Sequence, residues 1–148
     1  MEFNSMIIDH ICFAVKSLNE GIDYWGRIFG YNQMTFPVVN TRQKVKVVFL
    51  SKEGSLPVKL IEPVEGNNSL QNFVNRGGGF HHICFKCANV ETTAGKLAEN
   101  GLITLTPSQP GEAFNNHNIA FLLAKYGLNM ELIDTDEKAA LIVRDSRQ

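Results

Sequence analysis

Apolar residues in the first part of the chain change from a nearly continuous run to a helical spacing, and this change predicts two elements. Residues 7–15 are mostly apolar and rich in β-prone types, which is typical of a strand. Beyond them, apolar side chains recur every three or four residues and predict one face of a helix. These positions are Ile22, Trp25, Ile28 and Phe29. Ser17 and Glu20 have the spacing of a capping box at its start, and Gly30 suits its end.

The same order of elements occurs twice. In the first half, further β-prone runs predict strands at 33–38, 44–50 and 58–62. In the second half, the pattern predicts a strand at 83–88, a helix at 91–100 ended by Gly101, and strands at 104–106, 118–124 and 128–134. Each half therefore has the order βαβββ.

An internal repeat with an offset of 72 residues supports this division. The sequence DHICF at 9–13 resembles HHICF at 81–85, and KLIE at 59–62 resembles ELID at 131–134. Phe-Leu occurs at 49–50 and again at 121–122. Because the matches share one offset, the chain reads as two copies of one module. The expected parts are a first module at 6–64, a linker at 65–79, a second module at 80–135 and a charged tail at 136–148, which is either a short helix or frayed.

Composition narrows the class of protein. The chain has 148 residues, of which 44% are hydrophobic and 20% charged, as in a globular domain. It has 14 Lys and Arg against 15 Asp and Glu, which argues against a general nucleic-acid binder. No apolar run approaches the roughly 18 residues of a membrane span, and no secretory signal begins the sequence. We therefore expect a cytoplasmic protein without membrane partners, with its three cysteines reduced.

Two histidines and two charged residues occupy equivalent positions in the repeat. His10 matches His82, and Lys59 matches Glu131. If the modules pair around a pseudo-two-fold axis, these four side chains converge on one cleft. Two imidazoles and a carboxylate form a suitable ligand set for a divalent metal with open coordination positions. The alternative interpretation is a buried Lys59–Glu131 ion pair with the histidines as hydrogen-bond partners.

The sequence resembles the vicinal oxygen chelate superfamily, which includes glyoxalase I and the bleomycin-resistance proteins. The resemblance extends from residue 8 to about residue 134 and is carried by DHICFAV at 9–15, KLIEP at 59–63 and GGGFHHICF at 77–85. The last two segments are most similar to methylmalonyl-CoA epimerases. The resemblance implies an α+β fold, in which two tandem βαβββ modules form a curved mixed β-sheet around a cleft, and it implies a homodimer.

The resemblance also assigns roles to residues. His10, His82 and Glu131 match the family's metal ligands, whereas His81 would lie outside the site. The candidates for the single divalent metal are cobalt, nickel, zinc, manganese and iron. Such a site implies an epimerase-like or lyase-like enzyme that forms an enolate or oxyanion on a small acyl substrate, a CoA thioester or another anion. Glu131 would also transfer a proton, and Lys59 or Arg42 would position the anion.

Two positions depart from the family pattern. Lys59 stands where glyoxalases and epimerases usually have a Glu or Gln ligand, and a protonated lysine repels a cation. Arg42 stands where the epimerases tend to have a catalytic glutamate. If Lys59 replaces the metal, the protein needs no cofactor, as in a metal-free binding protein of the bleomycin-resistance type. If three ligands suffice, an Fe(II) extradiol-type dioxygenase is a further alternative.

Overall fold

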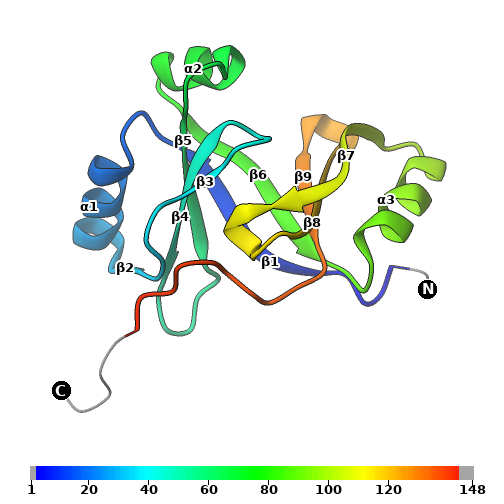
Figure 1. Ribbon diagram of the computed structural model, residues 1–148, viewed down its shortest axis with the longest axis horizontal. Helices are drawn as coiled ribbons and strands as arrows, with labels where there is room; N and C mark the ends of the chain where they lie inside the picture. Colours follow the sequence, from blue (N-terminus) through cyan, green and yellow to red (C-terminus); the bar gives the residue numbers. More distant parts are fainter. Residues whose placement is uncertain (1–2, 144–148) are drawn as a thin grey trace.

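A curved mixed β-sheet forms the centre of the molecule, and three α-helices lie around it (Figure 1). The computed structural model describes residues 3–143. The strands are β1 (Ile7–Ala14), β2 (Asn32–Gln33), β3 (Val38–Asn40), β4 (Val45–Ser51), β5 (Val58–Pro63), β6 (Gly79–Lys86), β7 (Ile103–Gly111), β8 (His117–Leu123) and β9 (Asn129–Ile133). The helices are α1 (Leu18–Phe29), α2 (Asn68–Asn75) and α3 (Val90–Glu99), with short 3-10 turns η1 (Glu112–Phe114) and η2 (Lys125–Gly127). None of the helices in this part of the chain is long and apolar enough to span a membrane.

The sheet consists of two equivalent halves, which join where β1 pairs antiparallel with β6. In each half the first strand pairs parallel with the last, β1 with β5 and β6 with β9. β4 then pairs antiparallel with β5, as β8 does with β9. The strand order over the described residues is β2-β4-β5-β1-β6-β9-β8-β7, with β3 on β4. This topology confirms the expected α+β fold of two βαβββ units.

Equivalent polar residues begin α1 and α3. Ser17 and Asn89 each accept a hydrogen bond from the backbone N–H three residues later. Glu62 and Asp134 lie near the end of the last strand of each half. Their carboxylates accept a hydrogen bond from the first backbone N–H of the helix in the same half. Gly30, with a φ of +75°, ends α1 in the left-handed conformation that glycine adopts without strain. The predicted helix starts and the predicted C-cap are confirmed.

Three apolar clusters fill the two faces of the sheet. One packs α1 against the first half and includes Leu18, Val48, Leu50, Val58 and Leu60. One packs α3 against the second half and includes Val90, Leu97, Ala120, Leu122 and Leu132. The third includes Cys12, Cys84, Val47, Phe49 and Phe114. Since strand residues alternate between faces, the third cluster lies on the face opposite α1 and α3, and this face carries the polar groups described below.

The connection between the halves contains a helix that the sequence pattern does not predict. α2 lies inside 65–79, the range expected as a linker, and packs Leu70 and Val74 against the third cluster. The chain then returns into β6 through Gly78, whose φ is +64°. A Cβ atom there would lie 2.5 Å from the carbonyl oxygen of Ala14, so this return requires glycine.

Three predicted strands differ in extent from the structure. β6 begins at Gly79, four residues before the predicted 83–88, and ends at Lys86. β2 and β3 replace the single strand predicted at 33–38. The regular hydrogen-bond ladder is interrupted there, because the backbone N–H groups of Met34 and Thr35 both donate to the carbonyl oxygen of Phe49 and because Pro37 has no N–H to donate. β7 is longer than the predicted 104–106. It contains two prolines, which an edge strand tolerates.

The C-terminal segment crosses from β9 to the first half of the molecule (Figure 1). Leu141 forms a β-bridge with Thr35, and Lys138 is buried on the way. The tail expected at 136–148 thus has specific contacts over 136–143, and residues 144–148 lie outside the described residues.

Candidate functional site

Two rows of side chains cross the central strands on the face opposite α1 and α3. The rows are Lys59–Cys12–His82 on β5, β1 and β6, and His10–Cys84–Glu131 on β1, β6 and β9. Register partners point to the same side of a sheet, and the repeat exchanges one row with the other. The two small cysteines in the middle leave room above them for the four larger polar side chains. The structure therefore brings together the two histidines, the lysine and the glutamate singled out in the sequence.

A β-bulge precedes each histidine. The register between β1 and β6 skips Asp9 on one strand and His81 on the other. A bulged residue does not follow the strict alternation of faces, and both side chains turn toward the histidine that follows. Asp9 Oδ2 lies 2.7 Å from Nδ1 of His10, and Nδ1 of His81 lies 2.7 Å from Nδ1 of His82. His81, which the sequence placed outside the site, contacts it directly.

One oxygen of Glu131 is the centre of the polar cluster. Its Oε1 lies 2.8 Å from Nζ of Lys59, 3.1 Å from Nε2 of His10 and 3.2 Å from Nε2 of His82. All four residues are at most 2% exposed. The second oxygen, Oε2, is also buried and has no hydrogen-bond partner among residues 3–143.

Glu131 and Lys59 stabilise each other's charged forms. Burial opposes the carboxylate, but the Lys59 charge and hydrogen bonds from both histidines outweigh it and hold the pKa of Glu131 well below its usual 4.5. Burial likewise opposes the ammonium, and the charge of Glu131 outweighs it and raises the pKa of Lys59 above 10.5. Both groups are therefore ionised at neutral pH.

The two histidines of β6 are held in the neutral form. Burial lowers the pKa of His82 to about 3, and the charge of Lys59 acts in the same direction. The pKa of His81 is lowered from 6.5 by the same two causes, burial first. At neutral pH each ring carries one hydrogen, which leaves one nitrogen of each as an acceptor.

The His10 end of the cluster is packed by protein. Phe49 and Phe114 contact the His10 ring, with centroid distances of 5.1 and 6.2 Å. Lys138 reaches this end from the C-terminal segment, and its Nζ lies 3.3 Å from Oδ2 of Asp9. Burial would raise the pKa of Asp9, but His10 and Lys138 together lower it. Asp9 and Lys138 thus form a second ion pair beside the first.

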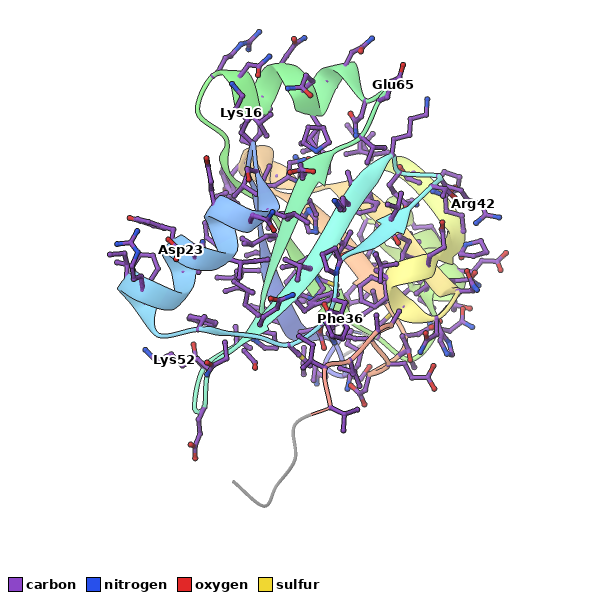
Figure 2. All side chains as sticks on the ribbon, turned by 60° about the vertical axis from the view of Figure 1, so that its left-hand side comes forward. Lys16, Asp23, Phe36, Arg42, Lys52 and Glu65 are labelled. Atoms are coloured by element: carbon purple, nitrogen blue, oxygen red, sulfur yellow. The ribbon has the colours of Figure 1, made fainter. Side chains whose placement is uncertain are left out.

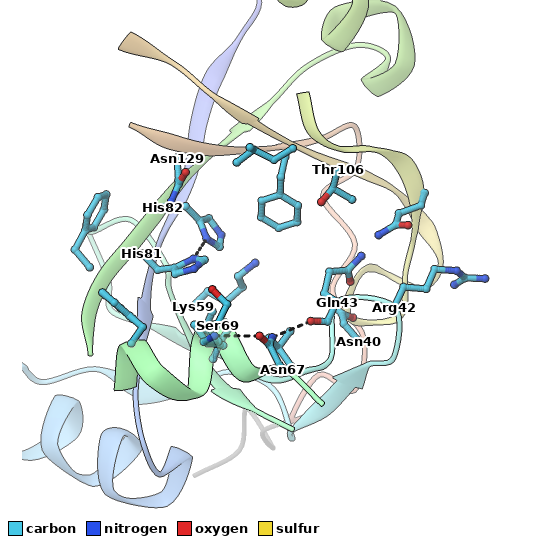
Figure 3. Close-up of a pocket in the computed structure, with 18 residues that line it drawn as sticks. Asn40, Arg42, Gln43, Lys59, Asn67, Ser69, His81, His82, Thr106 and Asn129 are labelled. Atoms are coloured by element: carbon cyan, nitrogen blue, oxygen red, sulfur yellow. Dashed lines mark hydrogen bonds between the residues drawn. The ribbon is translucent and has the colours of Figure 1, made fainter. Parts of the chain in front are cut away.

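The His82 end opens into a cleft of about 700 Å³ between the two halves. Figure 3 shows Lys59, His81 and His82 along one side of this cleft, and Gln43 and Arg42 along the other. Both amide atoms of Gln43 are buried, and neither has a hydrogen-bond partner in the described part of the chain. An unpartnered buried amide costs free energy, so Gln43 offers the cleft a donor and an acceptor for a ligand.

Arg42 lies at the rim of the cleft. Figure 2 shows it projecting at the outer edge of the molecule, and its side chain is 51% exposed. Its Nη1 lies 3.9 Å from Glu112 Oε1, which is a weak ion pair in water. The structure thus places Arg42 where it can meet the outer part of a ligand, away from the buried cluster.

Comparison with known proteins places this arrangement in a family. Residues 9–121 match the model of the Glyoxalase/Bleomycin resistance protein/Dioxygenase superfamily. The chain belongs to this superfamily. Over 101 residues it is 25% identical to the mitochondrial methylmalonyl-CoA epimerase of Bos taurus, a match that covers 67% of this chain and 57% of that protein. The chain therefore spans little more than half the length of that relative.

Solved structures share the superfamily fold seen here. A hypothetical protein of Bacillus halodurans C-125 superposes with a TM-score of 0.77 at 26% identity, covering 92% of this chain and 99% of the other. The methylmalonyl-CoA epimerase of Streptomyces coelicolor in complex with 2-nitronate-propionyl-CoA has a TM-score of 0.72 at 26% identity, covering 87% and 96%.

The donor set of this superfamily member fits a divalent metal in part. In the described part of the chain, the triplets whose ligand atoms lie within 4.8 Å of one another are His10–Cys84–Glu131 and Cys12–His81–His82, and these side-chain types can bind a divalent ion. The expected set of His10, His82 and Glu131 is divided between these two triplets, and its imidazoles meet only at Oε1 of Glu131. The Lys59 ammonium lies 2.8 Å from the same carboxylate oxygen. A metal bound to this oxygen at the usual distance of about 2 Å would lie against the ammonium, and the two cations would repel each other.

Proposed function

We propose that this protein is an isomerase-type enzyme that moves a proton at the carbon next to the carbonyl group of a small anionic acyl compound. CoA thioesters are the favoured substrate class, because the chain resembles methylmalonyl-CoA epimerases. The observation that carries the proposal is the hydrogen-bonded series from Glu131 through His82 to His81, which ends in the cleft.

The series defines which nitrogen of His81 can accept a proton. Glu131 is ionised, so Nε2 of His82 donates its hydrogen to the carboxylate and Nδ1 of the same neutral ring is an acceptor. Nδ1 of His81 then donates to it across 2.7 Å. The remaining nitrogen of His81, Nε2, carries no hydrogen and has a free lone pair, as a general base requires.

Lys59 supplies the complementary charge. When His81 Nε2 takes the proton, the C–H bond breaks and its electron pair moves toward the carbonyl oxygen, which becomes an enolate oxygen. The Lys59 ammonium lines the same cleft and stabilises this negative charge. After the planar enolate has turned in the cleft, His81 returns the proton to its opposite face, which inverts the carbon and completes the isomerisation.

The opposite side of the cleft binds the rest of the substrate. The unpartnered amide of Gln43 can hydrogen-bond a carboxylate or thioester group. Arg42 at the rim carries a guanidinium charge toward solvent, where the phosphates of a CoA moiety would bind. These contacts orient the acyl group over Lys59 and His81.

Exchange of a substrate proton with solvent tests this function. Methylmalonyl-CoA is incubated with the chelator-treated protein in D2O, and deuterium at the acidic carbon is followed by mass spectrometry. We expect exchange by the wild type and a loss of about 100-fold or more in His81→Asn, the typical contribution of a general base. His117→Asn is the matched control, because His117 is a surface histidine paired with Glu137.

The results separate the proposal from its alternatives. Equal exchange in His81→Asn and the wild type would show that His81 is not the base. Saturable binding of acyl-CoA compounds without exchange would instead indicate a metal-free binding protein. That second candidate is favoured by Arg42, because the family resemblance expects a catalytic glutamate at its position.

A further inference from the structure

Each carboxylate of the cluster has a lysine counter-charge without an added ion, over the part of the chain that the structure describes. Lys59 neutralises Glu131 at 2.8 Å, and Lys138 neutralises Asp9 at 3.3 Å. These groups and His10 are buried or nearly so. A divalent ion would add two positive charges to a dehydrated cluster whose carboxylates are already paired with lysines, which is unfavourable.

The two imidazoles are committed to the same carboxylate oxygen. Nε2 of His10 and Nε2 of His82 both lie within hydrogen-bond distance of Oε1 of Glu131. An ionised carboxylate only accepts, so both nitrogens carry hydrogens. A metal ligand needs a nitrogen without one, so metal binding would require both hydrogen bonds to break.

Lys59 approaches this oxygen from the position equivalent to Glu131 in the other half. We propose that its ε-ammonium is the permanent cation of the site, that the protein takes up no divalent metal there, and that Lys59→Gln opens a four-donor metal site completed by His10, His82 and Glu131. This inference rests on the proposed function, since it concerns the same site and identifies Lys59 as the cation that faces the substrate there. It is tested by metal binding and not by turnover, so either idea can fail without the other.

A cobalt titration compares the wild type with Lys59→Gln and Lys59→Arg. Each protein is treated with chelator, dialysed and titrated with CoCl2, and binding is followed by visible absorption and calorimetry. Lys59→Gln removes a positive charge and adds a carbonyl oxygen, so we expect one Co(II) per chain, bound about 30-fold or more tighter than by the wild type. Lys59→Arg keeps the charge and is expected to behave like the wild type.

Thermal unfolding with and without CoCl2 gives a second measure. We expect Co(II) to raise the melting temperature of Lys59→Gln and to leave that of the wild type unchanged. The gain should disappear in the double variant Lys59→Gln/His82→Ala. If Lys59→Gln folds only with metal present, refolding with and without CoCl2 shows the same dependence.

Two results would overturn the proposal. One is stoichiometric binding of Co(II) by the wild type that is lost in His82→Ala, since the ammonium would then not exclude the metal. The other is a folded Lys59→Gln protein that binds no more Co(II) than the wild type.

Discussion

Lys59 and Glu131 carry opposite charges at equivalent positions of the repeat, and both are at most 2% exposed. Burial removes the hydration of both ions, and their mutual attraction replaces it only while both are present. Removing one leaves the other charged in a dehydrated region. Each residue is therefore required for the stability of the other.

Glu131→Gln is expected to destabilise the protein strongly. The substitution keeps the size of the side chain but leaves Lys59 without its counter-charge, which costs about 3–5 kcal/mol for a buried pair. The measurement is the free energy of unfolding in urea at pH 7. Asp23→Asn is the matched control, because Asp23 pairs with Arg27 in water and its loss should cost less than about 1 kcal/mol.

The difference between the wild type and Glu131→Gln should depend on pH. The pKa of Glu131 is well below 4.5 in the folded protein, so the unfolded chain binds its proton first as the pH falls. The contribution of the carboxylate is complete above about pH 4.5 and decreases as the pH falls toward the folded pKa. A difference that stays constant from pH 6 down to pH 3, or one that grows in acid, would contradict the lowered pKa, because the unfolded chain takes up its proton near pH 4.5.

The sequence predicts most of the residues of the candidate site. The offset of 72 residues identifies His10, His82, Lys59 and Glu131 as one set, and the structure brings them together. His81 could not be assigned from the sequence, because strand alternation places neighbours on opposite faces and only a bulge changes this. The adjacent pair Asp9–His10 in the first half was the one available signal, since both bulged residues precede a histidine.

Among the elements, the turn between α2 and β6 depends most strictly on one residue. Gly78→Ala is expected to destabilise the protein, since a left-handed backbone costs a non-glycine residue about 1–2 kcal/mol before the contact with Ala14 is counted. Gly95→Ala serves as the opposite case, because Gly95 lies inside α3 with open space around it and alanine there should stabilise by about 0.5–1 kcal/mol. Urea denaturation measures the change in the free energy of unfolding of each variant. A Gly78→Ala protein as stable as the wild type would contradict the expected strain at this turn.

Elements with strong periodicity and caps were predictable, and short ones were not. α1 has a clear apolar face, a capping serine and a terminal glycine, and its limits agree with the prediction. α2 buries only Leu70 and Val74 and lies between Asn-rich and Gly-rich segments, which favour a loop interpretation. Its helical form depends on packing against the sheet, which a local pattern does not contain.

At the scale of the whole molecule, the C-terminal segment ties the second half to the first. Its backbone hydrogen bonds join Ala139 to Ala113, Phe36 to Ala140 and Ile142 to Met34. Deleting residues 136–148 removes these three bonds, at about 1 kcal/mol each, and also Lys138, the counter-charge of Asp9. We therefore expect the free energy of unfolding to fall by about 3 kcal/mol or more. Chemical denaturation of the shortened chain tests this.

A shorter deletion is the control for this prediction. Removing 144–148 leaves every contact of the segment named above in place, and we expect an unchanged free energy of unfolding. If both deletions have the same effect, the contacts of 136–143 do not contribute to stability as proposed.

Strands of both halves contribute to the buried polar cluster, and the side chain at position 59 decides whether the cluster contains its own cation. Lys59 lies at the edge of a set that otherwise consists of metal-ligand types. In the genetic code, lysine differs from both glutamine and glutamate at the first base of the codon alone. A single point mutation therefore separates a site whose cation is a lysine side chain from one that must bind a metal ion supplied by the cell. During evolution, one base change can convert either form of the site into the other and so change whether the protein requires a metal.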